Sequence, residues 1–302
     1  MAKQLKENAI VKNDLLEFLN SYSDFSFELS ILKMLREKMI DCEHGGLYED
    51  PVTGKSREFD IRAIKTISHY RVRLAIECKN IRKYFPILIS CVPRHIDESY
   101  HQIAIVNEPR FARDALHVLT DIRRPRAKTI NVKGDESIYK PNTPVGKSTV
   151  QVGRAKNDSI VSHDSELYDK WSQSLSSSTD LVKNMYWDGD KDDSESWFFS
   201  AIFPIIVVPN GRLWIAEYDT DGNRIIDPSQ TTRCSCFIDK NYGMGTEIAR
   251  TSLWISHIEI MTYDGIFSFI DDYLSDEKGM KKIFSEEVVG TAKQWGSDKI
   301  KL

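Results

Sequence analysis

The feature that most constrains this chain is a strongly apolar strand pattern that ends in two charged residues. Residues 71–79 read Arg-Val-Arg-Leu-Ala-Ile-Glu-Cys-Lys, so Glu77 and Lys79 lie two positions apart. Alternate residues of a strand share one face, which places this carboxylate and this ammonium together. Residues 57–65 predict a second strand, and a hairpin that turns at residues 68 and 69 pairs Ile61 with Ile76.

This register has consequences that support it. On one face it pairs only apolar residues, namely Phe59 with Cys78, Ile61 with Ile76 and Ala63 with Leu74. On the other face Asp60 lies opposite Glu77 and Glu58 lies opposite Lys79, with β-carbons about 5 Å apart in each pair. A slip by one residue would bury these charges and expose the apolar row. The Ser-His turn fits less well, because two-residue hairpin loops favour Gly or Asn.

Two carboxylates that face each other across a ladder predict a bound cation. Like charges at paired positions destabilise a sheet unless one acid is protonated or a cation lies between them. A hard divalent ion with oxygen ligands, Mg²⁺ above all, suits this position. Lys79 would then hold a metal-bound water or help to deprotonate it. The alternative interpretation is a solvent-facing strand in which Glu58 pairs with Lys79 and Asp60 is solvated.

Residues 46–79 also carry a family resemblance. They run Gly46-Leu47-Tyr48-Glu49-Asp50-Pro51, then Gly54-Lys55 and Arg57-Glu58-Phe59-Asp60, and they close on Ile76-Glu77-Cys78-Lys79. An Asp on one strand, followed by Glu-x-Lys at the end of the next, resembles the PD-(D/E)XK nuclease superfamily, which has the restriction-endonuclease-like fold. The resemblance covers residues 24–92. The chain departs from the family pattern at Phe59, which stands in place of the nominal Pro.

The resemblance implies a set of site residues. It assigns Asp60, Glu77 and the backbone carbonyl of Cys78 to a Mg²⁺ or Mn²⁺ ion, and it assigns Lys79 to the attacking water. Many members of the superfamily carry a further Glu on the first helix of the core. Glu28 fits this place, because the predicted helix 24–40 turns its apolar stripe and Glu28 towards the sheet. The alternative role for Glu28 is that of a first-turn acid that complements the helix dipole.

The expected fold class is α/β, a restriction-endonuclease-like core in which helices flank a mixed β-sheet. Residues 1–122 are predicted to form N-terminal helices and the nuclease core. Residues 123–196 are polar and partly basic, which predicts an insertion or a flexible segment. Residues 197–302 are predicted to extend the same domain with further strands and a helix, including a hairpin at Pro209-Asn210-Gly211-Arg212.

Charge gives a second set of candidates. The net charge of −4 argues against indiscriminate coating of DNA. Basic residues nevertheless gather after residue 122 and near the predicted site, and the nucleic-acid-binding candidates are Lys55, Arg57, Arg123, Arg124, Arg126 and Lys128. The alternative is a solvated, partly flexible surface segment.

Composition predicts a soluble cytoplasmic protein. The five cysteines are odd in number and scattered, which indicates reduced thiols rather than a disulfide framework. The first residues lack the apolar stretch of a signal peptide, and the longest apolar run, 197–208, is too short to span a bilayer. No membrane association is expected, and the sequence is compatible with a homodimer.

From the residues and the resemblance we expect a metal-dependent nuclease that hydrolyses phosphodiester bonds in nucleic acid. The favoured interpretation is an endonuclease that acts on DNA. Two alternatives remain open. One is a catalytically inactive module that keeps the nuclease fold and binds nucleic acid or serves a structural role. The other is a nuclease for RNA or structured junctions. Binding that is indifferent to a chelator would distinguish the inactive module from both nucleases.

Overall fold

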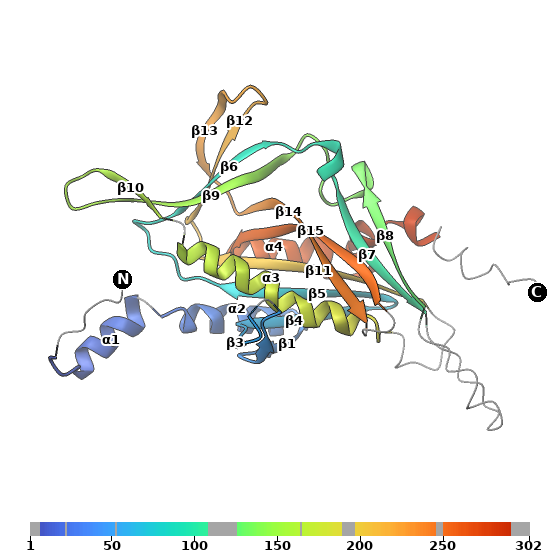
Figure 1. Ribbon diagram of the computed structural model, residues 1–302, viewed down its shortest axis with the longest axis horizontal. Coiled ribbons are helices and arrows are strands. Elements are labelled where there is room, and N and C mark those ends of the chain that lie inside the picture. Colours follow the sequence, from blue (N-terminus) through green and yellow to red (C-terminus); the bar gives the residue numbers. More distant parts are fainter. Residues whose placement is uncertain are drawn as a thin grey trace, which may run out of the picture.

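The chain folds around one large mixed β-sheet with helices on both of its faces (Figure 1). The computed structural model describes residues 7–21, 23–51, 53–107, 126–163, 165–188, 197–245 and 250–290. Within these ranges the protein is a mixed α/β structure, which confirms that much of the predicted fold class. No helix of the described ranges is long and apolar enough to cross a membrane.

The described part of the chain forms fifteen strands. They are β1 (Asp41–His44), β2 (Leu47–Glu49), β3 (Ser56–Glu58), β4 (Ile61–Ile67), β5 (Tyr70–Cys78), β6 (Ile87–Pro93), β7 (Tyr100–Asn107), β8 (Arg126–Lys133), β9 (Pro144–Arg154), β10 (Ile160–His163), β11 (Trp197–Val208), β12 (Leu213–Tyr218), β13 (Arg224–Gln230), β14 (Arg233–Gly245) and β15 (Arg250–Thr262). The main path of the sheet is β1-β4-β5-β11-β15-β14-β9-β6-β12-β13, while β2 and β3 form a separate pair.

The predicted hairpin is present as β4 and β5. Ile61 pairs with Ile76 and Ala63 with Leu74, so the predicted register is confirmed over the length of β4. Ser68, in the turn, adopts a positive φ of 54°, and a Ser tolerates this less readily than the Gly or Asn that such turns favour. The ladder ends at Ile61. Residues 56–58 leave it and pair with β2 instead, so the expected pairing of Glu58 with Lys79 is wrong.

Strand β11 runs through the centre of the molecule and is buried on both faces. It pairs in parallel with β5 on one side and with β15 on the other. Its odd-numbered residues, such as Phe203, pack into one core cluster, whereas its even-numbered residues, such as Ile206, pack into clusters on the opposite face. A parallel strand covered on both faces is apolar throughout, which explains the continuous run in the sequence.

Helices cover the two faces unequally. The helices are α1 (Lys12–Ser21), α2 (Phe25–Glu37), α3 (Ser165–Met185), α4 (Tyr263–Tyr273) and α5 (Glu277–Phe284), with short 3₁₀ turns at Ile96–Glu98 and Gly134–Glu136. Helices α2, α4 and α5 share the core cluster of the odd-numbered β11 residues. Helix α3 packs on the other face. Figure 1 shows α3 crossing the sheet in front of β11 and β5, and α1 standing apart near the N-terminus.

The described residues within 123–196, predicted to be an insertion or a flexible segment, form β8, β9, β10 and the long helix α3. The chain does turn at Asn210 and Gly211, but β11 and β12 do not pair with each other; β12 continues to β6 and pairs with it in parallel. The predicted hairpin at this turn is therefore wrong, because the turn residues fix a local bend but not the partner of the next strand.

Candidate functional site

Asp60 and Glu77 lie side by side at one end of the β4–β5 hairpin. Asp60 directly precedes β4, and its Oδ2 accepts a hydrogen bond from the backbone N–H of Cys78 at 2.7 Å. Glu77 lies near the end of β5 on the face covered by α3, and its side chain is fully buried. The strand that carries one acid thus holds the other in place. The two carboxylates are therefore close together, although the ladder ends at Ile61 and Ile76 and does not itself pair Asp60 with Glu77.

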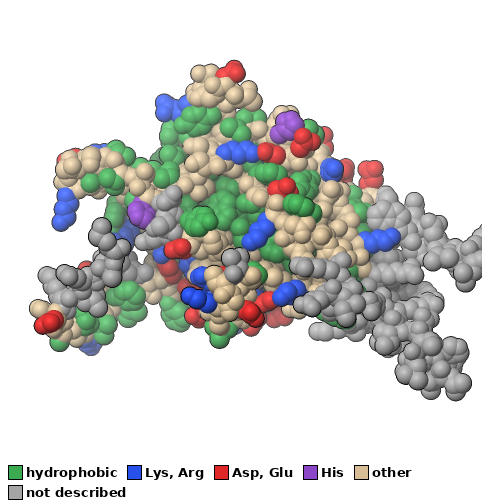
Figure 2. Space-filling view, viewed as in Figure 1, with side chains coloured by type: hydrophobic (Ala, Val, Ile, Leu, Met, Phe, Trp, Pro, Cys, Tyr) green, Lys and Arg blue, Asp and Glu red, His purple; other side chains and the backbone are tan. Residues whose placement is uncertain are grey.

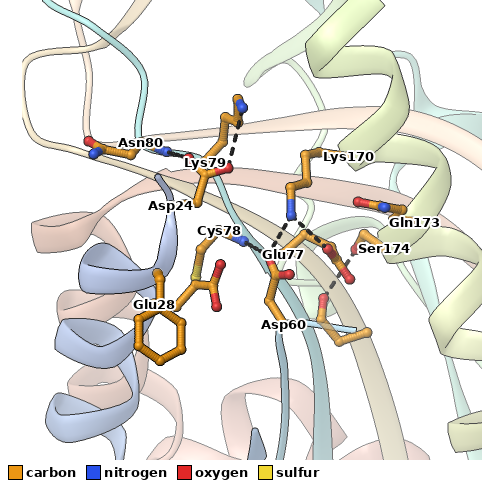
Figure 3. Close-up of polar contacts among 12 residues, drawn as sticks. Asp24, Glu28, Asp60, Glu77, Cys78, Lys79, Asn80, Lys170, Gln173 and Ser174 are labelled. Atoms are coloured by element: carbon orange, nitrogen blue, oxygen red, sulfur yellow. Dashed lines mark hydrogen bonds and ion pairs between the residues drawn. The ribbon is translucent and has the colours of Figure 1, made fainter. Parts of the chain in front are cut away.

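A lysine from the chain itself lies between the two acids. The Nζ atom of Lys170, on α3, is 2.7 Å from Oδ2 of Asp60 and 3.3 Å from Oε2 of Glu77. Figure 3 shows its ammonium pointing from the helix into the space between the carboxylates. Lys170 therefore supplies a positive charge between the facing acids, and sequence analysis did not predict this residue as part of the site.

Burial and the neighbouring charge of Asp60 make the ionised form of Glu77 unfavourable. Burial raises the pKa of the Glu77 carboxyl well above its usual range, and the nearby charge of Asp60 raises it further, while Lys170 only partly offsets both. Glu77 Oε1 is buried and has no hydrogen-bond partner. Burial lowers the pKa of Lys170, but the charges of Glu77 and Asp60 outweigh this and hold it above its usual value. One carboxylate oxygen thus remains available to a further ligand.

Glu28 reaches the same group from helix α2. Its Oε2 lies 3.4 Å from Nε2 of His44 on β1. Burial raises the pKa of Glu28 and the charge of Asp60 adds to this, against the opposing contact with His44. Helix α2 therefore turns Glu28 towards the sheet as predicted, and its carboxylate lies within electrostatic range of Asp60 (Figure 3).

Lys79 occupies a different position from the one expected. Its Nζ is 3.3 Å from Oδ2 of Asp24, the residue before α2. The other oxygen of Asp24 accepts the backbone N–H of Asn80 at 2.7 Å. The structure thus ties Lys79 to the start of α2 and places Lys170 beside the acid pair. Cys78 lies between the two arrangements, and its side chain is buried in the core under α2.

Among the basic candidates, Lys128 lies far from the acid pair. Lys128 pairs with Ile105, which pairs with Phe199 of β11, whereas Glu77 pairs with Ile206. The two positions are seven residues apart along β11, or roughly 23 Å at about 3.3 Å per residue. Lys128 therefore borders the opposite end of the sheet from Glu77.

Of the remaining basic candidates, only Lys55 and Arg57 have described side chains. Arg57 pairs with Asp50 at 2.8 Å on the β2–β3 hairpin that leads into Asp60, and Lys55 lies in the turn of that hairpin. Arg123 and Arg124 lie outside the described residues, as does the side chain of Arg126. Figure 2 shows the described Lys and Arg side chains of one face scattered among acidic and apolar ones rather than gathered in a patch.

Helix α3 is held against the sheet by hydrogen bonds in the turns that follow Lys170. Ser174 Oγ, one turn after Lys170, donates to the carbonyl of Ala75 at 3.1 Å. Further along, Arg62 donates to the carbonyl of Ser177 at 3.0 Å and Tyr242 to that of Leu175 at 2.8 Å. Buried serines at positions 174, 177 and 178 let the helix approach the sheet closely. A helical stripe of Leu167, Lys170, Ser174, Ser178 and Leu181 was the available signal for this face.

The donor set agrees with a small hard cation. Within the described ranges, no group of three or more His, Cys, Asp and Glu side chains is arranged to hold a metal ion. Mg²⁺ does not need such a group, because it is usually bound by one or two carboxylates and keeps several waters. Asp60 and Glu77 supply two carboxylates, and the unpartnered Oε1 of Glu77 supplies a free ligand atom. These residues therefore fit Mg²⁺ or Mn²⁺.

Comparison of the chain with protein-family models, with curated proteins and with solved structures gives no match. The class of protein is therefore defined by fold and site alone. It is a mixed α/β protein in which a large sheet flanked by helices carries a buried acid pair that is bridged by a lysine.

Proposed function

We propose that this protein is a metal-dependent nuclease of the PD-(D/E)XK superfamily that hydrolyses phosphodiester bonds in nucleic acid, with DNA as the first expected substrate. The observation that carries the proposal is the pair of adjacent carboxylates, Asp60 and Glu77, at the ends of two neighbouring strands. Like charges in this position destabilise a fold, and they are typical of sites that bind a cation.

The order of elements around the pair supports the proposal. Helix α2 carries Glu28, and the antiparallel strands β1, β4 and β5 follow, with Asp60 before β4 and Glu77 near the end of β5. Helix α3 then covers the other face, and β11 pairs in parallel with β5. This is a mixed sheet between helices, with the acids at the positions that the family resemblance implies. The long segment between β5 and α3 would be an insertion into such a core.

The residues present can divide the chemistry among them. Asp60, Glu77 and, as the resemblance implies, the backbone carbonyl of Cys78 would hold Mg²⁺ or Mn²⁺. When bound, such an ion polarises the scissile phosphate and lowers the pKa of a water. Hydrolysis adds the oxygen of water to phosphorus and breaks one ester bond, and the departing oxygen receives a proton. Glu77 is fully buried, whereas Asp60 and Lys170 each remain partly exposed, so a substrate would approach the site from their side.

A catalytically inactive module that keeps this fold is the second candidate. One observation favours it: Lys170 already pairs with both acids, so the protein needs no metal to satisfy them. Such a module would bind nucleic acid or act structurally without regard to metal.

Cleavage assays separate these candidates. Supercoiled plasmid, single-stranded DNA and structured RNA are incubated with the protein in Mg²⁺ or Mn²⁺, with and without EDTA. The matched variants are Asp60→Asn and Glu77→Gln, which keep the shape of each side chain, and Glu49→Gln on the exposed strand β2 as the control. We expect cleavage that requires metal, falls at least about 100-fold in the first two variants and persists in the control.

Three alternative outcomes would each contradict part of the proposal. Binding without cleavage in the wild type, unaffected by EDTA, favours the inactive module. Cleavage that persists in EDTA or in Asp60→Asn removes the acid pair as the site. Cleavage restricted to RNA keeps the reaction but replaces DNA as the substrate.

A further inference from the structure

We propose that Lys170 of α3, rather than Lys79, is the catalytic lysine of this site, and that its ammonium donates a hydrogen bond to a non-bridging oxygen of the scissile phosphate. This inference rests on the proposed nuclease function and deepens it. It replaces the lysine of the Glu-x-Lys pattern with one that comes from a different element of the fold.

The two lysines differ in what they contact. Lys170 Nζ lies within hydrogen-bond distance of both members of the acid pair, at 2.7 Å and 3.3 Å. Lys79 Nζ lies 3.3 Å from Oδ2 of Asp24, the residue that precedes α2. Figure 3 shows the two ammonium groups pointing to different carboxylates. A group must lie within reach of the reacting atoms to serve them, and by this geometric test Lys170 is the better placed lysine.

The net charge of Glu28, Asp60, Glu77 and Lys170 is compatible with a divalent metal ion beside Lys170. The three acids together carry three negative charges when ionised, and Lys170 contributes one positive charge. Two negative charges then remain, which is the charge that one divalent cation compensates. Asp24 and Lys79 compensate each other. Lys170 would not need to leave the site when a metal binds to Asp60 and Glu77, and its ammonium could then donate to the phosphate.

The position of Lys170 is fixed in advance of any substrate. The next turn of α3 is held to β5 by Ser174, whose side chain is fully buried. The Lys170 side chain is 15% exposed, against 13% for Asp60 and 0% for Glu77. Both carboxylates therefore hold the ammonium, while a small part of the Lys170 side chain stays exposed, as does a similar part of Asp60. Electrostatic groups that are oriented before the reaction stabilise developing charge without reorganisation.

The test compares lysine variants in two measurements, single-turnover cleavage of DNA and calorimetric binding of Mn²⁺. Lys170→Met removes the charge and keeps most of the stem, and Lys79→Met does the same at the other lysine. Lys183→Met is the matched control, because Lys183 lies in the last turn of α3 and its side chain is 57% exposed. We expect Lys170→Met to lower the cleavage rate at least about 100-fold and to bind Mn²⁺ at least as tightly as the wild type. Lys79→Met should lose about tenfold or less.

A second variant guards against misfolding of Lys170→Met. Lys170→Arg keeps a positive charge beside the buried acids, but its planar guanidinium differs in shape from the compact ammonium. We expect a loss of about tenfold or more in rate, with Mn²⁺ affinity unchanged within about threefold.

The remaining outcomes overturn the inference in distinguishable ways. A larger loss of rate in Lys79→Met than in Lys170→Met assigns the role to Lys79. Loss of Mn²⁺ binding together with rate in Lys170→Arg makes Lys170 structural only. Wild-type cleavage that survives in Lys170→Met overturns this inference alone. Absence of wild-type cleavage on every substrate overturns it together with the proposed function.

Discussion

At the scale of single residues, the site is organised by charges that burial makes unfavourable. A buried carboxylate is destabilising unless it is paired or protonated. Glu77 is fully buried and forms an ion pair, at 3.3 Å, with Lys170, which also pairs with Asp60. The pKa of Glu77 and that of Glu28 both lie above the usual 4.5. Protons and a divalent cation therefore compete for the same oxygens.

This competition predicts that metal binding depends on pH. Because the pKa of both glutamates is raised, the folded protein still holds protons above pH 4.5, and a cation must displace them. Affinity for Mn²⁺ should therefore rise as the pH rises from 4.5 through the folded-state pKa values. Calorimetry in two buffers of different ionisation enthalpy should show net proton release at the lower end of this range. An affinity that is constant with pH would contradict the raised pKa values.

At the scale of elements, helix α3 completes the site because it supplies Lys170. It is also the element that sequence analysis predicted least well. The β4–β5 hairpin was predictable because its apolar and charged residues alternate with the period of a strand. Helix α3 buries several serines beside apolar residues such as Leu167 and Val182, so its sequence is more polar than that of an ordinary core helix. Lys170 is 93 residues from Glu77 in the sequence, and only tertiary contact brings them together. For the same reason the Asp60–Glu77 pair was predictable and its cation was not.

Asp188, just after α3, provides a prediction about this element. Its carboxylate accepts hydrogen bonds from Arg73 at 2.5 and 2.7 Å and from Arg71 at 2.6 Å, and it also accepts one from Ser200. Both Asp188 and Arg73 are buried, so this contact fixes the end of α3 on β5. Asp188→Asn should lower the free energy of unfolding by about 3–5 kcal/mol, because it leaves a buried guanidinium uncompensated.

Urea unfolding at pH 7 measures this loss. Asp227→Asn is the control, since Asp227 pairs with Arg224 at the surface and its side chain is 87% exposed; its effect should stay under about 1 kcal/mol.

Burial raises the pKa of Asp188, but hydrogen bonds and charge from Arg73 outweigh this and hold it below 3.8. A depressed pKa means that the stabilisation is complete above pH 3.8 and is lost below it. An Asp188→Asn loss no larger than that of the control would show that α3 is held elsewhere.

At the scale of the whole molecule, distant elements are joined by buried histidines. His101 on β7 contacts Ser137 Oγ through Nδ1 at 2.9 Å, and its Nε2 donates to the carbonyl of Ile283 on α5 at 2.7 Å. Burial lowers the pKa of His101 to about 4, against the opposing effect of that carbonyl. His257 on β15 is buried nearby, and burial, with a smaller contribution from Arg94, lowers its pKa to about 2. Both side chains are neutral in the folded protein near neutral pH.

These histidines predict that acid destabilises the whole fold. An unfolded His takes up a proton near pH 6.5, whereas folded His101 does so only near pH 4. The stabilisation is therefore complete above pH 6.5 and falls with pH between these values, by about 1.4 kcal/mol per pH unit and about 3 kcal/mol in total for His101. Urea unfolding between pH 6.5 and 4 should show this slope in the wild type, together with the contribution of His257.

The variant His101→Gln tests the origin of the slope rather than the absolute stability. Gln cannot take up the proton, so the slope should fall by about 1.4 kcal/mol per pH unit even if the variant is less stable at every pH. His95→Gln is the control, because His95 lies in an exposed turn with 70% of its side chain accessible, and its slope should match that of the wild type. A slope in His101→Gln equal to that of the wild type would assign the acid sensitivity to other groups. A reduced slope would show that buried His101, which joins β7 to α5, contributes to the lower pH limit of the fold that holds the site.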